Sequence, residues 1–431
     1  MPFHEACTAA RKAGQPVPPR LGLLIGAQFA SALADNALLI VAIALLEQQG
    51  QPGWWAPLLK FGFMLSYVLL APFVGPLADA FPKARVMEAM NLVKVLGVFA
   101  LLAGLHPVVA LAVVGFGAAA YAPAKYGLVT ELVGPEALVA ANAWLEVTVV
   151  CAVLLGTVLG GFLISPWVLA WCHALQGWSG AEALTLPLLA LLGFYALASG
   201  LNLGVPDSGA RYPRTAVHMR ALLRRFAQGN ATLWRDAEGG LSLAATTIFW
   251  GAGATLQFAL LRWAIDVLDL TLDRAAYLQA AVAVGVVAGA AAAGRWVPLR
   301  QAPRMLAAGV AMGLLIPFVA SVREIALVVP LLALVGVIGG FMVVPLNALL
   351  QHRGFVLLTA GRSIAVQGFN ENLSVLAMLA VYATLLALEV PIAATLWLLG
   401  LFVAAVVGVL MLRGYRRGKG FGVAGARARV R

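Results

Sequence analysis

Asp35 lies in the middle of a long apolar stretch, where an ionisable side chain is unexpected. Gln28 and Ser31 precede it at helical spacing, so all three side chains fall on one face of a helix. A charge at the centre of a membrane helix costs at least about 2.5–3.5 kcal/mol on insertion scales, which makes it a functional candidate by default. We predict that this face, together with Asn36, points into a polar cavity and binds substrate. A structural hydrogen bond between helices is the alternative.

Polar and charged side chains recur in other apolar stretches. Asn142 and Glu146 share one helical face, and Glu371 follows Gln367 and Asn370. We predict that both groups face the same cavity and contribute to substrate binding.

Three more residues are candidates for the polar part of a substrate. Lys125 lies near one end of an apolar stretch, where it can reach the membrane interface or, equally well, pair with Asp35 or Glu146. Arg262 precedes several acidic residues, so an ion pair at the surface is its alternative, and Gln257 lies deeper in the same stretch. We expect Asp35 to meet a substrate ammonium in one state and a protein base, Lys125 or Arg262, in another.

These residues are embedded in a chain that is almost entirely apolar. Of its 431 residues 62% are hydrophobic and 11% are charged, with a mean hydropathy of +0.93. A soluble protein carries about 25% charged residues, and a bilayer core needs about 20 apolar residues per helix. We therefore predict an all-α membrane protein with twelve transmembrane helices and no separate catalytic domain. The predicted spans are 20–47, 57–80, 86–105, 108–132, 138–165, 183–205, 240–265, 275–297, 303–321, 325–350, 361–388 and 390–413.

The net charge of +11 indicates how these spans are oriented. Most of the 29 Lys and Arg residues fall on one side of the predicted membrane, and the cytoplasmic side of a membrane protein carries such an excess. We predict an inner-membrane protein with both termini in the cytoplasm. The basic excess then needs no nucleic-acid partner.

The longest polar interval divides the chain near its middle. It predicts an N-terminal six-helix bundle over 1–205, a cytoplasmic linker over 206–239 with a surface helix at 217–227, and a C-terminal six-helix bundle over 240–431. Such duplications are common in transporters.

A weak internal sequence repeat supports two pseudo-symmetric halves. Gly117 and Pro123 in the fourth span have the same spacing as Gly339 and Pro345 in the tenth, and each following span opens with an Asn and an acid. Matching Gly and Pro breaks predict a central site between the halves.

Other chemistry finds no support in the residues. The His and Cys residues are scattered and form no metal-ligand or disulfide spacing, and no nucleophile–base pair or Walker lysine pattern occurs. The first apolar stretch is too long for a cleavable signal peptide. We expect no metal, no cofactor and no enzymatic activity.

The loop between the second and third spans has the form Gly-x3-Asp-x3-Lys-x-Arg, set by Gly75, Asp79, Lys83 and Arg85. An acid there can sit at a helix N-terminus and be bridged by the following bases, which would latch the cytoplasmic side. The motif resembles the inter-helix loop of the major facilitator superfamily, whose fold is two six-helix bundles that rock around a central cavity. The resemblance implies a gating role for these residues.

Longer strings resemble the bacterial lysophospholipid transporter family within that superfamily. They span both halves and are Gln28-Phe with Asp35-Asn36-Ala-Leu-Leu, Ala71-Pro-Phe-Val-Gly75, Ala118-Ala-Ala-Tyr-Ala-Pro-Ala-Lys-Tyr-Gly127, Phe249-Trp-Gly-Ala-Gly253, Val343-Val-Pro-Leu-Asn-Ala-Leu-Leu-Gln351 and Ile364-Ala-Val-Gln367 with Glu371-Asn372. The resemblance implies transport of lysophosphatidylethanolamine and related lysolipids from the periplasmic to the cytoplasmic leaflet. An acyltransferase or acyl-carrier-protein synthetase would then re-acylate them as part of phospholipid repair.

The resemblance also gives residues their roles. It makes Asp35 a substrate or gating residue, and it leaves open whether Arg262 or Gln257 contacts the phosphate, because the family often has a basic residue where this chain has Gln257. A zwitterionic head group needs an acid and a base, and the acyl chain needs an apolar wall open to membrane lipids. Two other functions remain open on the residues alone: a proton-coupled exporter of amphipathic drugs, with Asp35 or Glu371 carrying the proton, and a sensor or scaffold that transports nothing.

Overall fold

The computed structural model describes residues 19–51, 55–176, 184–210, 212, 218–270 and 272–427. Within these ranges the regular secondary structure is entirely helical. Residues 1–18 and 428–431, on which the predicted cytoplasmic termini depend, and residues 211 and 213–217 of the predicted linker lie outside the described parts.

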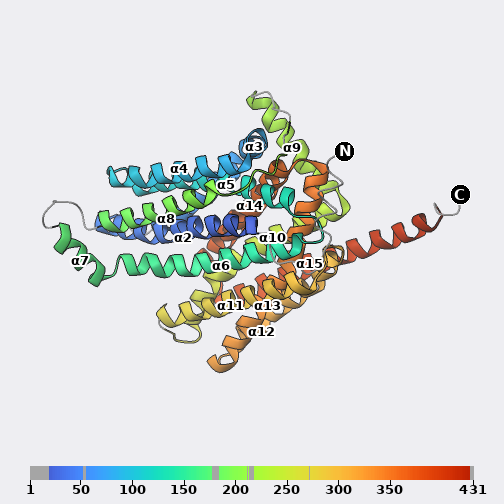
Figure 1. The fold of residues 1–431 in the computed structure, drawn as a ribbon. Coiled ribbons are helices and arrows are strands. Elements are labelled where there is room, and N and C mark those ends of the chain that lie inside the picture. Colours follow the sequence, from blue (N-terminus) through green and yellow to red (C-terminus); the bar gives the residue numbers. More distant parts are fainter. Residues whose placement is uncertain are drawn as a thin grey trace. The chain divides into compact units, whose positions relative to one another are not determined.

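The helices follow the predicted spans closely (Figure 1). Their bounds are α2 (Pro19–Gln48), α3 (Trp55–Ala80), α4 (Lys83–Leu102), α5 (Pro107–Leu132), α6 (Leu138–Leu163), α7 (Pro166–Gln176), α8 (Thr185–Leu203), α9 (Met219–Arg235), α10 (Ala237–Asp266), α11 (Leu272–Trp296), the 3-10 helix η1 (Leu299–Met305), α12 (Leu306–Ser321), α13 (Ile325–Leu357), α14 (Ala360–Ala387) and α15 (Ile392–Arg427).

Among the described residues, 11 helices are long and apolar enough to cross a membrane. The one predicted span missing from these 11 is 86–105, which corresponds to α4. This helix has 20 residues, a length that fits the bilayer, but its charged side chains, among them Glu88 and Lys94, reduce its apolarity. The prediction of an all-helical membrane protein is confirmed.

The chain forms two compact units, which do not coincide with the two halves of the sequence. Unit 1 consists of Met1–Gly134, Thr148–Phe226 and Thr359–Gly368, and unit 2 of Pro135–Val147, Ala227–Leu358 and Phe369–Arg431. The chain passes from one unit to the other within α6, α9 and α14, and also in the short segments just before α6 and α14. The predicted bundle boundaries at 205 and 240 remain a prediction.

In unit 1, α2 packs against α8, and α4 packs against both α5 and α8. Small residues allow the close approach of α4 and α5, because a Cβ at Gly117 would lie 2.8 Å from the Met90 carbonyl oxygen. This packing brings the middle of α4 next to the face of α2 that carries Asp35.

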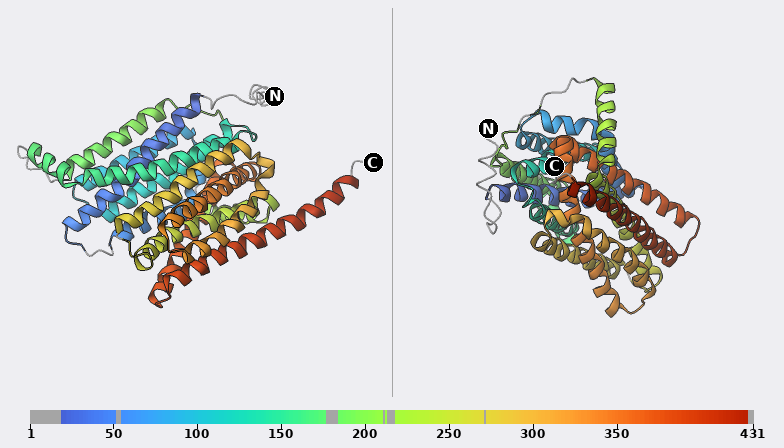
Figure 2. Two further views of the ribbon diagram at one scale, coloured as in Figure 1. Left: turned by 90° about the horizontal axis from the view of Figure 1, so that it is seen from below. Right: turned by 90° about the vertical axis from the view of Figure 1, so that its right-hand side faces the viewer.

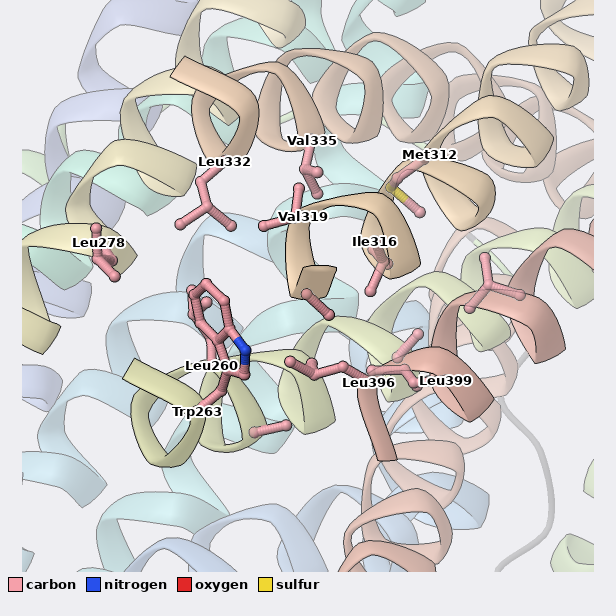
Figure 3. Close-up of a cluster of buried hydrophobic side chains, with 14 of the residues drawn as sticks. Leu260, Trp263, Leu278, Met312, Ile316, Val319, Leu332, Val335, Leu396 and Leu399 are labelled. Atoms are coloured by element: carbon pink, nitrogen blue, oxygen red, sulfur yellow. The ribbon is translucent and has the colours of Figure 1, made fainter. Parts of the chain in front are cut away.

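In unit 2, α11 packs against α13, and α12 packs against α15. A Cβ at Gly289 of α11 or at Gly340 of α13 would collide with a backbone carbonyl of the facing helix, so the contact between α11 and α13 depends on glycine. The core centres on Trp263, whose indole is fully buried among Leu260, Leu278 and Leu332 (Figure 3).

Two helical segments extend beyond the membrane-spanning parts of the chain, namely α9 and the end of α15. The surface helix predicted at 217–227 forms as α9 and extends to Arg235. The last helix, α15, runs unbroken to Arg427, although only Ile392–Gly414 is apolar enough to cross a membrane (Figure 2).

Candidate functional site

The Asp35 carboxylate has a partner on each oxygen, supplied by two different helices. Lys94 on α4 places its ammonium 2.6 Å from Oδ2, and the Tyr195 hydroxyl on α8 donates to Oδ1 at 2.7 Å. The side chains of Asp35 and Lys94 are 14% and 3% exposed. Asp35 is therefore a largely but not completely buried carboxylate, and both of its oxygens are paired in this structure.

Further contacts fix the Lys94 ammonium. It also donates to the Ser31 hydroxyl at 2.9 Å, and this hydroxyl donates to Asn91 Oδ1 at 3.0 Å. The Tyr121 ring lies 5.3 Å from Nζ, within cation–π range. We call Ser31, Asp35, Asn91, Lys94 and Tyr195 the Asp35 cluster.

Two predicted neighbours of Asp35 have different surroundings. Gln28 is buried, and neither of its amide atoms forms a hydrogen bond within the described parts of the chain. Asn36 donates to the Ala32 carbonyl oxygen of its own helix at 2.8 Å, and is half-buried. A buried amide without partners is costly, which makes Gln28 available to a polar substrate.

The base beside Asp35 differs from the two expected ones. Lys125 is buried, with its ammonium 4.0 Å from the centre of the Tyr126 ring. Arg262 is mostly exposed and pairs with Asp266 one helical turn later, which is the surface ion pair that its sequence context allowed. Lys94 takes the place beside Asp35 because α4 packs closely on α5 and α8.

The loop aspartate Asp79 is buried and caps the first turn of α14. Its Oδ1 accepts from the Gly361 backbone N–H at 2.9 Å, and its Oδ2 accepts from the Thr359 hydroxyl. Glycines allow this approach, since a Cβ at Gly361 would lie 2.7 Å from the Asp79 carboxylate and one at Gly75 would lie 2.9 Å from Arg362 Cα. The contact joins residues that are 282 positions apart in the sequence, within unit 1.

Lys83 links Asp79 to a second carboxylate. Its buried ammonium lies 2.6 Å from Glu131 and 3.8 Å from Asp79. Glu131 also accepts from the Tyr212 hydroxyl at 2.8 Å, and burial together with this carboxylate raises the pKa of Tyr212 above its usual value. Arg85 is exposed and makes no ion pair with any described residue. We call Asp79, Lys83, Glu131, Thr359 and Gly361 the Asp79 cluster.

In unit 2 the predicted polar residues form amide contacts. Asn142 and Gln351 exchange two hydrogen bonds of 2.9 Å, and both are buried. Asn370 donates to Asn230 at 2.9 Å and accepts from the Trp234 indole at 3.1 Å, so α9 holds a residue that the sequence assigns to the cavity.

The remaining predicted site residues differ in exposure. Glu146 and Gln367 are buried, and Glu371 is half-buried. Gln257 is exposed, and its backbone carbonyl oxygen accepts a hydrogen bond from the Gln279 side-chain amide at 2.9 Å. Among the described residues there is no group of His, Cys, Asp and Glu that could hold a metal ion.

Several partners in the two clusters were not predicted as site residues, namely Asn91, Lys94 and Tyr195 beside Asp35, and Glu131 and Thr359 beside Asp79. A lysine inside an apolar stretch was the available signal for Lys94, strengthened by Asn91 one turn before it on the same face. No signal in the sequence connects Thr359 with Asp79, because their contact depends on tertiary packing.

The fold and these clusters can be compared with known proteins. The family model of the Major Facilitator Superfamily matches residues 24–354. A bacterial homologue of the iron transporter ferroportin has a TM-score of 0.71 at 15% identity, covering 92% of this chain and 99% of its own. The fucose:proton symporter of E. coli has a TM-score of 0.69 at 15% identity, covering 92% of this chain and 98% of its own. The chain belongs to the major facilitator superfamily.

Closer relatives narrow this class. The lysophospholipid transporter LplT of Yersinia enterocolitica is 42% identical over 370 residues, which is 85% of this chain and 87% of the relative. LplT of Citrobacter koseri is 42% identical over 373 residues, 86% of this chain and 89% of the relative. Within the superfamily, the chain is thus a member of the lysophospholipid transporter family.

Proposed function

We propose that the protein transports lysophospholipids by alternating access. It takes lysophosphatidylethanolamine and related lysolipids from the periplasmic to the cytoplasmic leaflet of a bacterial inner membrane, where an acyltransferase re-acylates them. The observation that carries the proposal is the buried pair of Asp35 and Lys94. The relatives named as lysophospholipid transporters support it.

The pair matches the charges of a zwitterionic head group. The Lys94 side chain ends in a primary ammonium, which is the group that the ethanolamine head carries. A substrate ammonium can therefore replace Lys94 on the Asp35 carboxylate, and the released Lys94 can bind the substrate phosphate. Every charge keeps a partner during this exchange, which avoids the large cost of a bare charge in a low-dielectric interior.

The exchange would also link binding to conformation. A ligand shifts an equilibrium between two conformations only if it interacts differently with them. Since substrate binding breaks the contact between α2 and α4 made by Asp35 and Lys94, it changes the packing of these helices. The Gln28 amide, buried without hydrogen bonds to described residues, is a further contact for the head group.

The Asp79 cluster serves as the cytoplasmic latch in this proposal. It holds the start of α14 against the end of α3 through the Asp79 carboxylate. A carboxylate at a helix N-terminus is stabilised by the orphan N–H groups and the helix dipole. Opening toward the cytoplasm, which also holds both termini and the linker, requires these contacts to break.

Purified protein in liposomes tests the function directly. Fluorescent lysophosphatidylethanolamine is added to one leaflet, and its appearance in the other is followed by back-extraction with albumin. We expect transport well above that of protein-free liposomes and no dependence on a chemical change in the lipid. A drug flux that follows a pH gradient would indicate the exporter, no flux at all a sensor or scaffold, and an altered lipid an enzyme.

A further inference from the structure

Helix α9 connects two membrane helices but is itself too polar to enter the bilayer core. Its 17 residues end at Arg235, and the next residue, Asp236, caps α10 by accepting from the Gly239 N–H at 2.8 Å. The end of α9 therefore lies one residue before the start of α10, which is long and apolar enough to span a membrane.

The helix has a buried face and an exposed apolar face. Leu222 and Leu233 are buried against the protein. Met219, Leu223 and Trp234 are 59%, 46% and 41% exposed. With 3.6 residues per turn, these three exposed side chains fall within a sector of about 60°. Three large apolar groups in one exposed sector require a partner that is partly apolar.

Arginines border this apolar sector. Arg220, Arg224 and Arg235 are exposed and project on one side of it, within about 100° of its edge at 3.6 residues per turn. An apolar strip beside a row of arginines is the pattern of a helix that lies in the membrane interface. Arginine near an anionic lipid surface binds its phosphate groups.

Contacts at the other end position the helix. Asn230 and Trp234 are both hydrogen-bonded to Asn370 of α14. The C-terminal part of α9 is therefore held against α14.

We infer that the exposed face at the start of α9, formed by Met219, Arg220, Leu223 and Arg224, is a docking surface for anionic phospholipid head groups. The leaflet is the one from which α10 starts, which is the cytoplasmic leaflet by the distribution of charge. The apolar side chains enter the interface, and the arginines bind phosphate. A lipid surface fits better than an acidic protein because α9 is adjacent to a membrane-spanning helix.

Site-specific fluorescence in nanodiscs tests this surface. The native cysteines are replaced, and a bimane label is attached at Leu223→Cys or at the control position Gln228→Cys, which projects about 140° away at 3.6 residues per turn. Quenching by a lipid with a spin label near its head group is measured with and without phosphatidylglycerol. We expect several-fold stronger quenching at position 223, which increases with phosphatidylglycerol and decreases with salt.

Charge variants separate lipid binding from simple proximity. Arg220→Gln combined with Arg224→Gln should remove most of the increase caused by phosphatidylglycerol, whereas Arg225→Gln, exposed on another side of the helix, should leave it. Equal quenching at positions 223 and 228 would overturn the inference. Quenching at position 223 that does not depend on phosphatidylglycerol would also overturn it. If position 223 were protected from a soluble maleimide in native membranes but not in nanodiscs, the partner would be a protein, which would overturn it as well.

Discussion

The two units differ in the kind of contact that their predicted site residues make. In unit 1 the buried contact is an ion pair, Asp35 with Lys94, whereas in unit 2 it is a neutral amide pair, Asn142 with Gln351. A buried ion pair adds little net stability because both charges lose their water. Under the proposed function, the ion pair in unit 1 serves to recognise a charged group, while the amide pair needs only to connect two helices.

The largest expected effect comes from removing one charge of the pair. Lys94→Met should destabilise the protein by about 3–5 kcal/mol, because it leaves the Asp35 carboxylate buried without its cation. The double variant Asp35→Asn with Lys94→Met should regain most of this stability but should not transport lysophosphatidylethanolamine. Thermal unfolding in detergent and the leaflet assay measure the two effects. A double variant with normal transport would make the pair purely structural.

The comparison extends to the Asp79 cluster, which is also charged and buried. Asp79→Asn should weaken the hydrogen bonds at the start of α14 by about 1.5–3 kcal/mol and increase the population of the cytoplasm-open form. Spin-label distances across the cytoplasmic face report this population. Arg85→Gln is the matched control, since Arg85 belongs to the same loop motif but is exposed. Equal distance distributions for Asp79→Asn and the parent would exclude the latch.

The amide pair predicts a smaller and recoverable effect. Asn142→Ala should destabilise by about 1–3 kcal/mol, because the Gln351 amide is left buried without its partner. Replacing both residues with apolar ones of similar size should restore much of the loss while transport continues. Transport that disappears in a stable double variant would assign the pair to the substrate site and remove the difference between the units.

The smallest effect concerns Asp236, which caps the first turn of α10. Its hydrogen bonds from Arg353 and from the Gly239 N–H hold the pKa of this carboxyl below its usual value. The resulting stability is present above the unfolded pKa of about 3.9 and is lost only as pH falls through the lower folded pKa. Asp236→Ala should therefore cost about 0.5–2 kcal/mol, the value of an N-cap, with the same loss at every pH from about 5 to 8. A loss that changes across this range would point to another group.

Much of the fold could be predicted because apolar length alone identifies membrane helices. The span at 86–105 was also predicted correctly as a helix, although α4 carries too many charges to stand out by apolarity. The helical spacing of Gln28, Ser31 and Asp35 predicts the polar face of α2, because residues three and four apart lie on one face of a helix whatever the rest of the chain does.

The contacts between helices could not be predicted. The spacing of residues along the chain contains no distance between α2 and α4, so nothing in the predicted span 86–105 connects its lysine, Lys94, with Asp35. Local spacing did work for Arg262, where an acid one turn later is sufficient for the observed ion pair. Asn370 shows the limit, because an amide in an apolar helix fits a cavity as well as it fits the linker helix that it contacts.

The head-group dependence of transport tests the central role of Asp35 most directly. The leaflet assay compares lysophosphatidylethanolamine, which carries an ammonium, with lysophosphatidylglycerol, which does not, in the parent and in Asp35→Asn. We expect the variant to lose transport of lysophosphatidylethanolamine and to retain a larger share of lysophosphatidylglycerol transport. An equal loss of both lipids would mean that the carboxylate serves gating and does not bind the ammonium, and normal transport of both would contradict any role of Asp35 in transport.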